Sequence, residues 1–278
     1  MPFHLSQFAI NNKPTFGLIE KNLSRIFPLC PPNVRFDKKY KVCIDMKVTL
    51  LICTLNEIDG MKAVMPKIDP KWVDEILIID GGSTDGTVEY AKSQGFRVVM
   101  QKNRGLRRAY AEALEYISGD VVIAFSPDGN SLPEAIPQLV AKAREGYDLV
   151  MASRYAPGAH SDDDDWLTGF GNWMFPRLVN LLYGTKFTDV LGMYRAWRVD
   201  MFKHLGLADD NTFATEDRLF RDVIGCEVVM SLRVAKKKLK YIEIAASEPK
   251  RLGGQRKLRI FTWGSAHLFQ IFRELLIR

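Results

Sequence analysis

The sequence predicts an α/β protein whose mostly parallel sheet carries helices on both faces. From residue 47 onward, apolar β-branched runs alternate with segments of helical composition. Several of these runs, such as Val121-Val122-Ile123, are apolar throughout, which is typical of strands buried on both faces. Gly95 and Gly119 follow two of the helical segments, where a glycine commonly ends a helix. Strands that alternate with helices in this way favour a parallel sheet that is covered on both sides.

The first half of the chain supplies five strands and four helices in alternation. Strands are predicted over 48–53, 75–80, 96–100, 120–123 and 148–152, and helices over 57–64, 84–94, 104–117 and 132–145. Ser83 or Thr84 is the expected N-cap of the second helix, and Asn130 or Ser131 that of the fourth. Short polar side chains at these positions can accept hydrogen bonds from the first amides of a helix.

The second half has a different pattern. The loop over 156–165 contains four consecutive aspartates, Asp162–Asp165, and is interpreted as solvated. Helices are predicted over 171–183, 227–237 and 258–277, and a strand over 239–244. Residues 1–46 have mixed polarity and are interpreted as an irregular extension with one helix near 16–26. The chain is thus divided into an N-terminal extension (1–46), a main α/β domain (47–257) and a C-terminal amphipathic helix (258–278).

Composition and charge limit the function classes. The 278 residues carry 39 Lys and Arg against 33 Asp and Glu, and this net charge of +6 suits a polyanionic ligand or an anionic membrane surface without deciding between them. The four cysteines form no Cys-x-x-Cys pair, which favours reduced thiols over a zinc site or a disulfide framework. No leader-like run opens the sequence, and no run approaches the ~20 apolar residues of a spanning helix. We therefore expect a cytoplasmic protein that is soluble or lies on a membrane, with no nucleic-acid partner.

The turn around Asp128 is the first candidate site. Asp128 and Asn130 follow the strand over 120–123 and precede the helix over 132–145. They therefore lie at the carboxyl end of a strand, the edge at which open α/β sheets bind ligands. Carboxylate and amide oxygens are hard donors, suited to Mg²⁺ or Mn²⁺ bridging a diphosphate. The alternative is a strand-to-helix turn in which Asp, Gly and Asn serve local hydrogen bonding alone.

Three further segments end at the same edge. The first two strands are followed by Thr54-Leu55-Asn56-Glu57 and by Asp80-Gly81-Gly82-Ser83-Thr84-Asp85-Gly86-Thr87, neither of which is a dinucleotide or P-loop pattern. Asp80 could accept hydrogen bonds from a nucleobase or a ribose, although a capped turn is an equal alternative. The third segment, Lys102-Asn103-Arg104-Gly105-Leu106-Arg107-Arg108-Ala109, places guanidinium groups at a helix N-terminus, where phosphate is favoured; a solvated basic face is an equal alternative.

In this order and spacing, these motifs resemble family 2 glycosyltransferases of the GT-A fold. Three later segments are similar to the dolichol-phosphate mannose synthase branch: Ala152-Ser153-Arg154-Tyr155, the run from Asp189 to Arg195, and the run from Glu248 to Leu258. The resemblance covers about residues 47–260 and implies a GT-A, Rossmann-like domain. It further implies transfer of a hexose from a UDP- or GDP-sugar to polyprenyl phosphate, at the cytoplasmic face of a membrane.

The resemblance also assigns roles to positions. The nucleotide sugar would be bound by Thr54, Asn56, Glu57, Asp80, Gly82, Ser83, Asp85, Asn103, Arg104 and Gly105. Asp128 and Asn130 fall on the family's Asp-x-Asp metal motif, from which the neutral Asn130 departs, so the site has one negative charge fewer. The expected catalytic residues, which include cations that grip the donor diphosphate and the acceptor phosphate, are Asp128, Arg154, Arg251, Arg256 and Lys257. Arg256 stands where many relatives have Ser.

The acceptor decides whether a general base is needed. A phosphate monoester is already anionic near neutral pH and can attack the anomeric carbon directly, with inversion. A sugar hydroxyl, the acceptor of a soluble family 2 transferase, would need a carboxylate base. Glu216, Asp217 and Glu227 are the candidates, and helix-surface charge is the favoured interpretation of each. A non-catalytic homologue that binds a nucleotide sugar is a further alternative, which the neutral Asn130 leaves open.

A basic tract and the final helix suit a membrane surface. Ten Lys and Arg lie between Arg233 and Arg259, and large apolar side chains follow on the helix over 258–277. Alternatively, this helix packs on the sheet or on a second subunit. The four histidines show no metal-ligand spacing and receive no role.

Overall fold

The computed structural model describes residues 36–37, 42–43, 46–252 and 259–277. The predicted helix near 16–26 and the candidate residues Arg256 and Lys257 lie outside these ranges. Two short strands, β1 (Phe36–Asp37) and β2 (Val42–Cys43), form an antiparallel pair ahead of the main domain.

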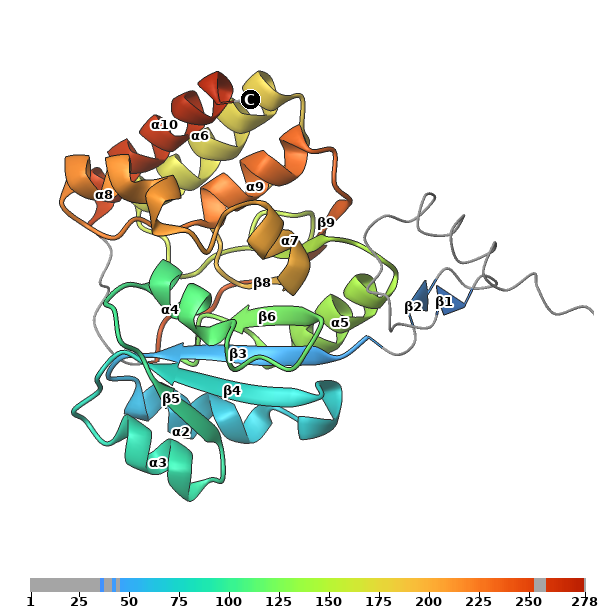
Figure 1. The fold of residues 1–278 in the computed structure, drawn as a ribbon, viewed down its shortest axis with the longest axis vertical. Coiled ribbons are helices and arrows are strands. Elements are labelled where there is room, and N and C mark those ends of the chain that lie inside the picture. Colours follow the sequence, from blue (N-terminus) through green and yellow to red (C-terminus); the bar gives the residue numbers. More distant parts are fainter. Residues whose placement is uncertain (1–35, 38–41, 44–45, 253–258, 278) are drawn as a thin grey trace, which may run out of the picture.

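A seven-stranded sheet forms the centre of the domain, in the order β5-β4-β3-β6-β8-β7-β9 (Figure 1). Its strands are β3 (Val48–Thr54), β4 (Glu75–Asp80), β5 (Arg97–Met100), β6 (Val121–Phe125), β7 (Leu149–Ser153), β8 (Arg195–Arg198) and β9 (Tyr241–Ala245). Every neighbouring pair is parallel except those formed by β8. The prediction of a mostly parallel sheet is therefore confirmed.

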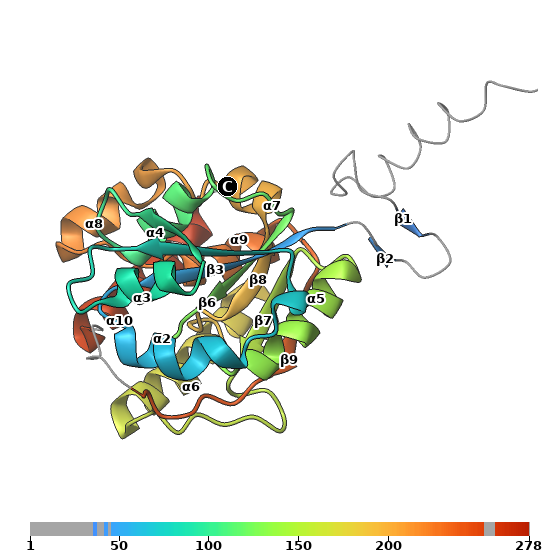
Figure 2. The same ribbon diagram turned by 90° about the horizontal axis from the view of Figure 1, so that it is seen from below.

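Two hydrophobic cores lie on opposite faces of this sheet, because successive side chains of a strand point to opposite sides. In β3, Leu50 and Ile52 belong to one core and Leu51 to the other. The first core is covered by α2 (Ile58–Val64), α3 (Thr87–Ser93) and α5 (Ile136–Arg144). The second is covered by α4 (Leu106–Ala113), α7 (Val199–His204) and α9 (Glu227–Lys236). Figure 2 shows α2, α3 and α5 on their side of the sheet.

Three more helices pack around α9, on the side away from α2 and α3 (Figure 1): α6 (Trp166–Tyr183), α8 (Ala214–Phe220) and α10 (Ile260–Leu276). The helix α10 contacts α6, α8 and α9, and its residues Ala266 and Ile271 are buried there. Its apolar face is thus divided between the protein and solvent, since Phe261 and Leu276 remain exposed. Short 3₁₀ helices complete the chain: η1 (Met65–Lys67), η2 (Pro70–Trp72), η3 (Pro133–Ala135) and η4 (Asp210–Phe213).

The segment from β8 to α8 contains elements that the sequence pattern did not predict. β8 is only four residues long, and two of them are arginines, so it shows no apolar alternation. It is nevertheless buried between β6 and β7, because the Arg195 guanidinium donates to the backbone carbonyls of Gly192 and Glu227. Backbone acceptors of this kind replace the water that a buried cation loses.

Three helix starts also differ from the predictions. α6 begins at Trp166, because Asp165, the last of the four aspartates, accepts from Thr168 N in a capping box. The predicted caps Ser83 and Thr84 are wrong. The residue before α3 is Gly86, which is in the left-handed conformation, and no side chain caps this helix. Neither Asn130 nor Ser131 caps a helix, because η3 starts after Leu132 without a side-chain cap.

Candidate active site

The Asp128 turn, which follows β6, packs tightly against the start of α2. A Cβ atom on Gly60 would lie 2.3 Å from Pro127 O and 3.1 Å from Asp128 Cα, so this helix position has room only for glycine. The Asp128 side chain is buried, and its Oδ1 accepts from Asn130 N at 3.0 Å. The close approach at Gly60 therefore fixes Asp128 beside the turn that leads from β3 into α2. No sequence pattern indicated a role for Gly60.

Asn130 supplies the second oxygen of the predicted metal pair. Its Oδ1 is buried and has no hydrogen-bond partner in the part of the chain that the structure describes. A buried polar atom without a partner is costly, so such an atom commonly marks a place for water or an ion. The Asp128 carboxylate and this amide oxygen fit a hard divalent cation in their chemistry. Within the described ranges no three His, Cys, Asp or Glu side chains cluster as a metal site, so a diphosphate and water would have to complete the ligand set.

The first two strand-to-helix turns are joined through Asp80. Its Oδ2 accepts from Thr54 Oγ1 at 2.7 Å and from Ser83 Oγ at 2.6 Å, and its Oδ1 accepts from the amides of Gly82 and Ser83. Gly82 has a φ of 96°, a left-handed conformation that suits glycine. Asp80 thus holds the second turn in place, and its hydrogen bond with Thr54 connects that turn to the last residue of β3.

Asn56 and Asp85 close the same pair of turns from the other side. Asn56 has a φ of 57°. Its Oδ1 accepts from Thr84 N, and its backbone N donates to Ser83 Oγ. Asp85 accepts from Thr87 and from Ile58 N. Burial opposes ionisation of Asp85, but these hydrogen bonds outweigh it and hold the pKa of Asp85 below its ordinary value. Glu57 is buried beside them and donates its amide to Thr87 Oγ1.

The third segment, Asn103 to Gly105, leads from β5 into α4. Asn103 donates from its backbone and side-chain nitrogens to Glu112 Oε1, at 2.8 and 2.9 Å. Arg104 is exposed and has no acidic partner among the residues that the structure describes. Gly105 has a φ of 114°, and a Cβ there would lie 2.5 Å from Val223, so the loop packs directly against the segment between α8 and α9. Arg104 is therefore the cation of this segment that is open to a ligand.

Arg154 follows β7 and lies in an ion-pair network. Its Nε and Nη2 donate to the two oxygens of Asp189 at 2.6 and 3.0 Å, and its Nη1 donates to Glu248 at 3.3 Å. Asp189 also accepts from the amides of Leu191 and Gly192. Burial would raise the pKa of Asp189, but Arg154 and these amides hold it below its ordinary value. The guanidinium is thus held in a fixed orientation.

A single stretch of chain, the 246–252 segment, connects this network with the Asp128 turn. It leaves β9, and Glu248 N donates to His160 O while Asp162 N donates to Glu248 O. Further along, Arg251 Nη2 lies 2.9 Å from Asp128 Oδ2, and Leu252 N donates to Asp128 O at 2.8 Å. Three of the predicted catalytic residues, Asp128, Arg154 and Arg251, are therefore brought together by one segment.

The interpretation of the three candidate base residues as helix-surface charges is wrong for Glu216 and Glu227, whereas Asp217 is partly exposed. Both glutamates are buried, and burial raises the pKa of both carboxyls. Glu216 pairs with Arg273 of α10. Asp217 pairs with Arg107 at 2.5 Å and accepts from Ile224 N. These charges join α8 to α4 and α10, which a local pattern could not reveal, because each partner lies more than fifty residues away.

Arg107 belongs to the third segment, but the sequence analysis did not anticipate its structural role. It is buried, pairs with Asp210 and Asp217, and lies 4.2 Å over the ring of Phe213. It anchors the helix that follows Asn103-Arg104-Gly105. The solvated-face alternative is wrong for Arg107, because its guanidinium is buried against these carboxylates.

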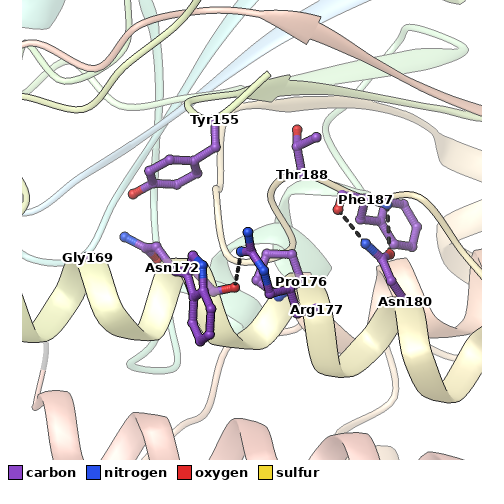
Figure 3. A pocket seen from close by; sticks show the side chains of 9 residues that line it. Tyr155, Gly169, Asn172, Pro176, Arg177, Asn180, Phe187 and Thr188 are labelled. Carbon is purple, nitrogen blue, oxygen red and sulfur yellow. Dashed lines mark hydrogen bonds between the residues drawn. The ribbon is translucent and has the colours of Figure 1, made fainter. Parts of the chain in front are cut away.

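A pocket of about 540 Å³ lies between α6 and the residues Tyr155, Phe187 and Thr188 (Figure 3). Tyr155 and Thr188, the neighbours of Arg154 and Asp189, face α6 across it. Trp173, Pro176 and Phe187 supply apolar walls, and Asn172, Arg177 and Asn180 supply polar groups. Arg177 stacks 4.4 Å over the ring of Trp173. The pocket thus combines aromatic surface with a cation, next to the ion-pair network.

The outer face of α6 is unusually apolar. Trp166, Phe170 and Trp173 follow at helical spacing with exposures of 83%, 55% and 53%, and Leu181 continues the row. We call these four residues the α6 stripe. The expected basic tract is less open than its composition suggests, because Arg233 and Lys236 pair with the buried Glu274. No helix in the described part of the chain has the length and hydrophobicity to cross a bilayer.

Solved structures with this fold include glycosyltransferases. Glucosyl-3-phosphoglycerate synthase from Mycobacterium tuberculosis, in complex with Mn²⁺, UDP-glucose and phosphoglyceric acid, superposes with a TM-score of 0.55 at 20% identity over 90% of this chain and 86% of that chain. A crystal structure described as a mycobacterial protein gives a TM-score of 0.62 at 17% identity, over 84% and 76% of the two chains. At these identities the likeness concerns the fold alone, and it confirms the predicted GT-A architecture.

Two relatives are more similar in sequence. Glycosyltransferase AglJ of Haloferax volcanii is 31% identical over 197 residues, which are 69% of this chain and 60% of AglJ. Undecaprenyl-phosphate 4-deoxy-4-formamido-L-arabinose transferase of Klebsiella pneumoniae is 32% identical over 164 residues, 55% of this chain and 49% of the relative. The chain therefore spans less than two thirds of the length of either.

The family model described as "Glycosyl transferase family 2" matches residues 50–206, more than half of the 278 residues. The matched range runs from β3 to the end of α7 and contains the Thr54, Asp80, Asn103, Asp128 and Arg154 segments described above. The chain belongs to glycosyl transferase family 2.

Proposed function

We propose that this family 2 glycosyltransferase is a metal-dependent, inverting enzyme that moves a hexose from a nucleotide-diphospho-sugar to a polyprenyl phosphate. One observation carries the proposal: the buried Asp128 carboxylate and the Asn130 oxygen, which has no partner among the described residues, lie in a turn that the 246–252 segment links to Arg154. Oxygen ligands and guanidinium groups are together suited to a donor diphosphate and an acceptor phosphate.

On the donor side, the turns organised by Asp80 and Asn56 would bind the nucleoside, and Arg104 is placed to meet a phosphate. Asp128 and Asn130 would hold Mg²⁺ or Mn²⁺. That ion would neutralise the charge that develops on the leaving diphosphate. The superposed mycobacterial synthase was crystallised with Mn²⁺ and UDP-glucose, which supports this assignment.

On the acceptor side, a phosphate oxygen would attack the anomeric carbon from the face opposite the diphosphate, and the bond from that carbon to the diphosphate would break. The nucleophile is already ionised, so no residue has to remove a proton. The ion pair of Glu216 and the burial of Glu227 agree with a site that works without a carboxylate base. Arg154 and Arg251 would position the phosphate and diphosphate charges.

The pocket beside Arg154 supports a lipid rather than a small acceptor. Its aromatic walls would receive the first isoprene units, and Arg177 would lie near the phosphate end. The α6 stripe runs along the same helix and suits docking at the surface of a bilayer, which would place the protein peripherally at the cytoplasmic face. A transferase named for undecaprenyl phosphate is among the similar sequences, which adds support.

The test is a screen of UDP- and GDP-sugars against a short polyprenyl phosphate, with lipid-linked product detected by mass spectrometry. We expect a polyprenyl-phosphate hexose whose formation stops when Mn²⁺ and Mg²⁺ are chelated. Release of free hexose without any lipid-linked product would contradict the proposal.

A sugar hydroxyl remains the second candidate acceptor, and Asp217 is the observation that favours it. Its side chain is 17% exposed and pairs with Arg107, on the helix that follows Arg104. If Asp217 were a general base, D217N would lower kcat by several orders of magnitude at unchanged KM. If the acceptor is a phosphate, D217N acts through the Arg107 pair and changes stability more than turnover.

A further inference from the structure

We infer that the Arg251 guanidinium occupies Asp128 Oδ2, an oxygen that the metal would use, until a donor binds. The divalent cation and the donor diphosphate would then enter the site together. The inference rests on the donor half of the proposed function, namely a cation and a diphosphate at Asp128 and Asn130. It adds a role for Arg251 that precedes any contact with the diphosphate.

The first observation is the ion pair itself. Arg251 Nη2 lies 2.9 Å from Asp128 Oδ2, while Asp128 Oδ1 accepts from Asn130 N. Both carboxylate oxygens therefore have partners, and the only charged partner in the described part of the chain is Arg251. A guanidinium on this oxygen excludes a cation from it by contact and weakens its binding nearby by repulsion.

The second observation is how Arg251 is delivered. Leu252 N donates to Asp128 O at 2.8 Å, and the Leu252 side chain covers Gly129 so closely that a Cβ there would lie 2.5 Å from Leu252 Cγ. The backbone next to Arg251 is thus fastened to the turn that carries Asp128. The guanidinium remains close to the carboxylate, which gives the ion pair a high effective concentration.

The third observation is that the ion pair leaves Arg251 incompletely satisfied. Its Nε is buried and has no hydrogen-bond partner in the ranges that the structure describes, and its side chain is 26% exposed. Arg154, by contrast, uses three nitrogens on two carboxylates. A diphosphate offers oxygens for a bidentate pair with the Arg251 guanidinium. Such a donor would therefore draw Arg251 away from Asp128 and free that oxygen for the cation.

Two consequences can be measured without any acceptor or turnover. Free Mn²⁺ should bind weakly, since it competes with a tethered cation. UDP should strengthen Mn²⁺ binding by more than its own oxygen ligands provide, because it also removes Arg251 from Asp128.

The experiment is a titration of free Mn²⁺ by electron paramagnetic resonance, with and without UDP. Arg251→Met removes the charge and introduces no oxygen that could itself bind Mn²⁺, whereas Arg251→Lys keeps a cation. Arg144→Met is the matched control, because Arg144 forms a partly exposed pair with Asp74, just before β4 and thus at the opposite end of that strand from Asp80. Circular dichroism confirms that each variant is folded, and Arg251→Ala replaces Arg251→Met if that variant is not.

We expect Arg251→Met to bind Mn²⁺ alone at least about tenfold more tightly than the wild type, the scale on which neighbouring groups tune metal sites. Arg251→Lys and Arg144→Met should stay close to the wild type, and the strengthening by UDP should shrink in Arg251→Met. Equal or weaker binding of free Mn²⁺ by Arg251→Met would overturn the inference. A chain that failed to glycosylate polyprenyl phosphate would still give this readout, so the two proposals fail separately.

Discussion

The guanidinium of Arg154 lies against the carboxylate of Asp189, with two nitrogen–oxygen distances of 2.6 and 3.0 Å. Asp189 begins the motif that ends at Arg195, and Arg154 lies within the Ala152–Tyr155 motif. Two segments that the sequence analysis treated separately are therefore one structural unit. Arg154 also pairs with Glu248, which connects this unit to the 246–252 segment that carries Arg251.

Asp189→Asn tests how much this pair stabilises the domain. The substitution leaves a largely buried guanidinium without its main counter-charge, so we expect the free energy of unfolding to fall by about 2–4 kcal/mol. Urea denaturation measures this. Arg97→Gln is the control, because the pair of Arg97 with Glu75 is half exposed on the arginine side and should contribute less than about 1 kcal/mol.

The same pair predicts a direction for the pH dependence. The pKa of Asp189 is lowered on folding, so its stabilising contribution is complete above the ordinary carboxyl pKa of 3.8 and is lost as the pH falls through the lowered folded value. The wild type should therefore lose more stability than Asp189→Asn below that pH. Equal acid-side slopes of the two unfolding curves would show that Asp189 is not ionised in the folded protein.

Gly60→Ala tests the close contact that fixes the Asp128 turn. Alanine usually stabilises a helix interior by about 1 kcal/mol relative to glycine, but here its Cβ would lie 2.3 Å from Pro127 O. We expect lower stability and weaker Mn²⁺–UDP binding, measured by thermal unfolding and calorimetry. Gly264→Ala in α10 is the matched control, since no described atom beyond its own helical turn lies within 4 Å of its Cβ position. If both variants were stabilised, the contact at Gly60 would be of no consequence.

Asn130→Asp tests the proposed metal pair. It adds a second carboxylate beside Asp128. Mn²⁺ affinity in the presence of UDP should then rise by about tenfold, because more negatively charged ligands strengthen binding at other hard-cation sites. Calorimetry measures the affinity. Asn211→Asp adds the same charge at an exposed position in η4 and should leave it unchanged. An unchanged affinity in Asn130→Asp would remove Asn130 from the site.

Replacing three aromatic residues of the α6 stripe with serine tests membrane docking. Trp166, Phe170 and Trp173 are largely exposed, so the triple variant should keep its stability and lose at least about tenfold in binding to vesicles that contain phosphatidylglycerol. Vesicle co-sedimentation measures binding. Met100→Ser with Leu219→Ser removes exposed apolar side chains from β5 and α8 and should have little effect. Binding that survives in the triple variant would assign the α6 stripe to another partner.

Several parts of the fold could be predicted because their signals are local. The apolar runs of β3, β4 and β6 give buried strands, and Gly95 ends α3 with a φ of 78°, as its position after the helix indicated. The caps of α3 and α5 were misassigned, since a short polar side chain before a helix can satisfy other groups. Ser83 Oγ instead donates to Asp80 and accepts from Asn56 N, and Asn130 Oδ1 has no partner in the described ranges.

The sequence by itself determined the family, the mostly parallel sheet and which residue types follow each strand, because a strand, its turn and the following helix are adjacent in the chain. Only the tertiary structure decided which charged side chains form ion pairs within the protein. Arg107 and Glu216 form ion pairs with residues more than fifty positions away. Arg251, near the C-terminal end of the domain sequence, pairs with Asp128 near its middle. Burial makes such long-range pairs necessary, since a charge removed from water needs a counter-charge wherever the fold can supply one.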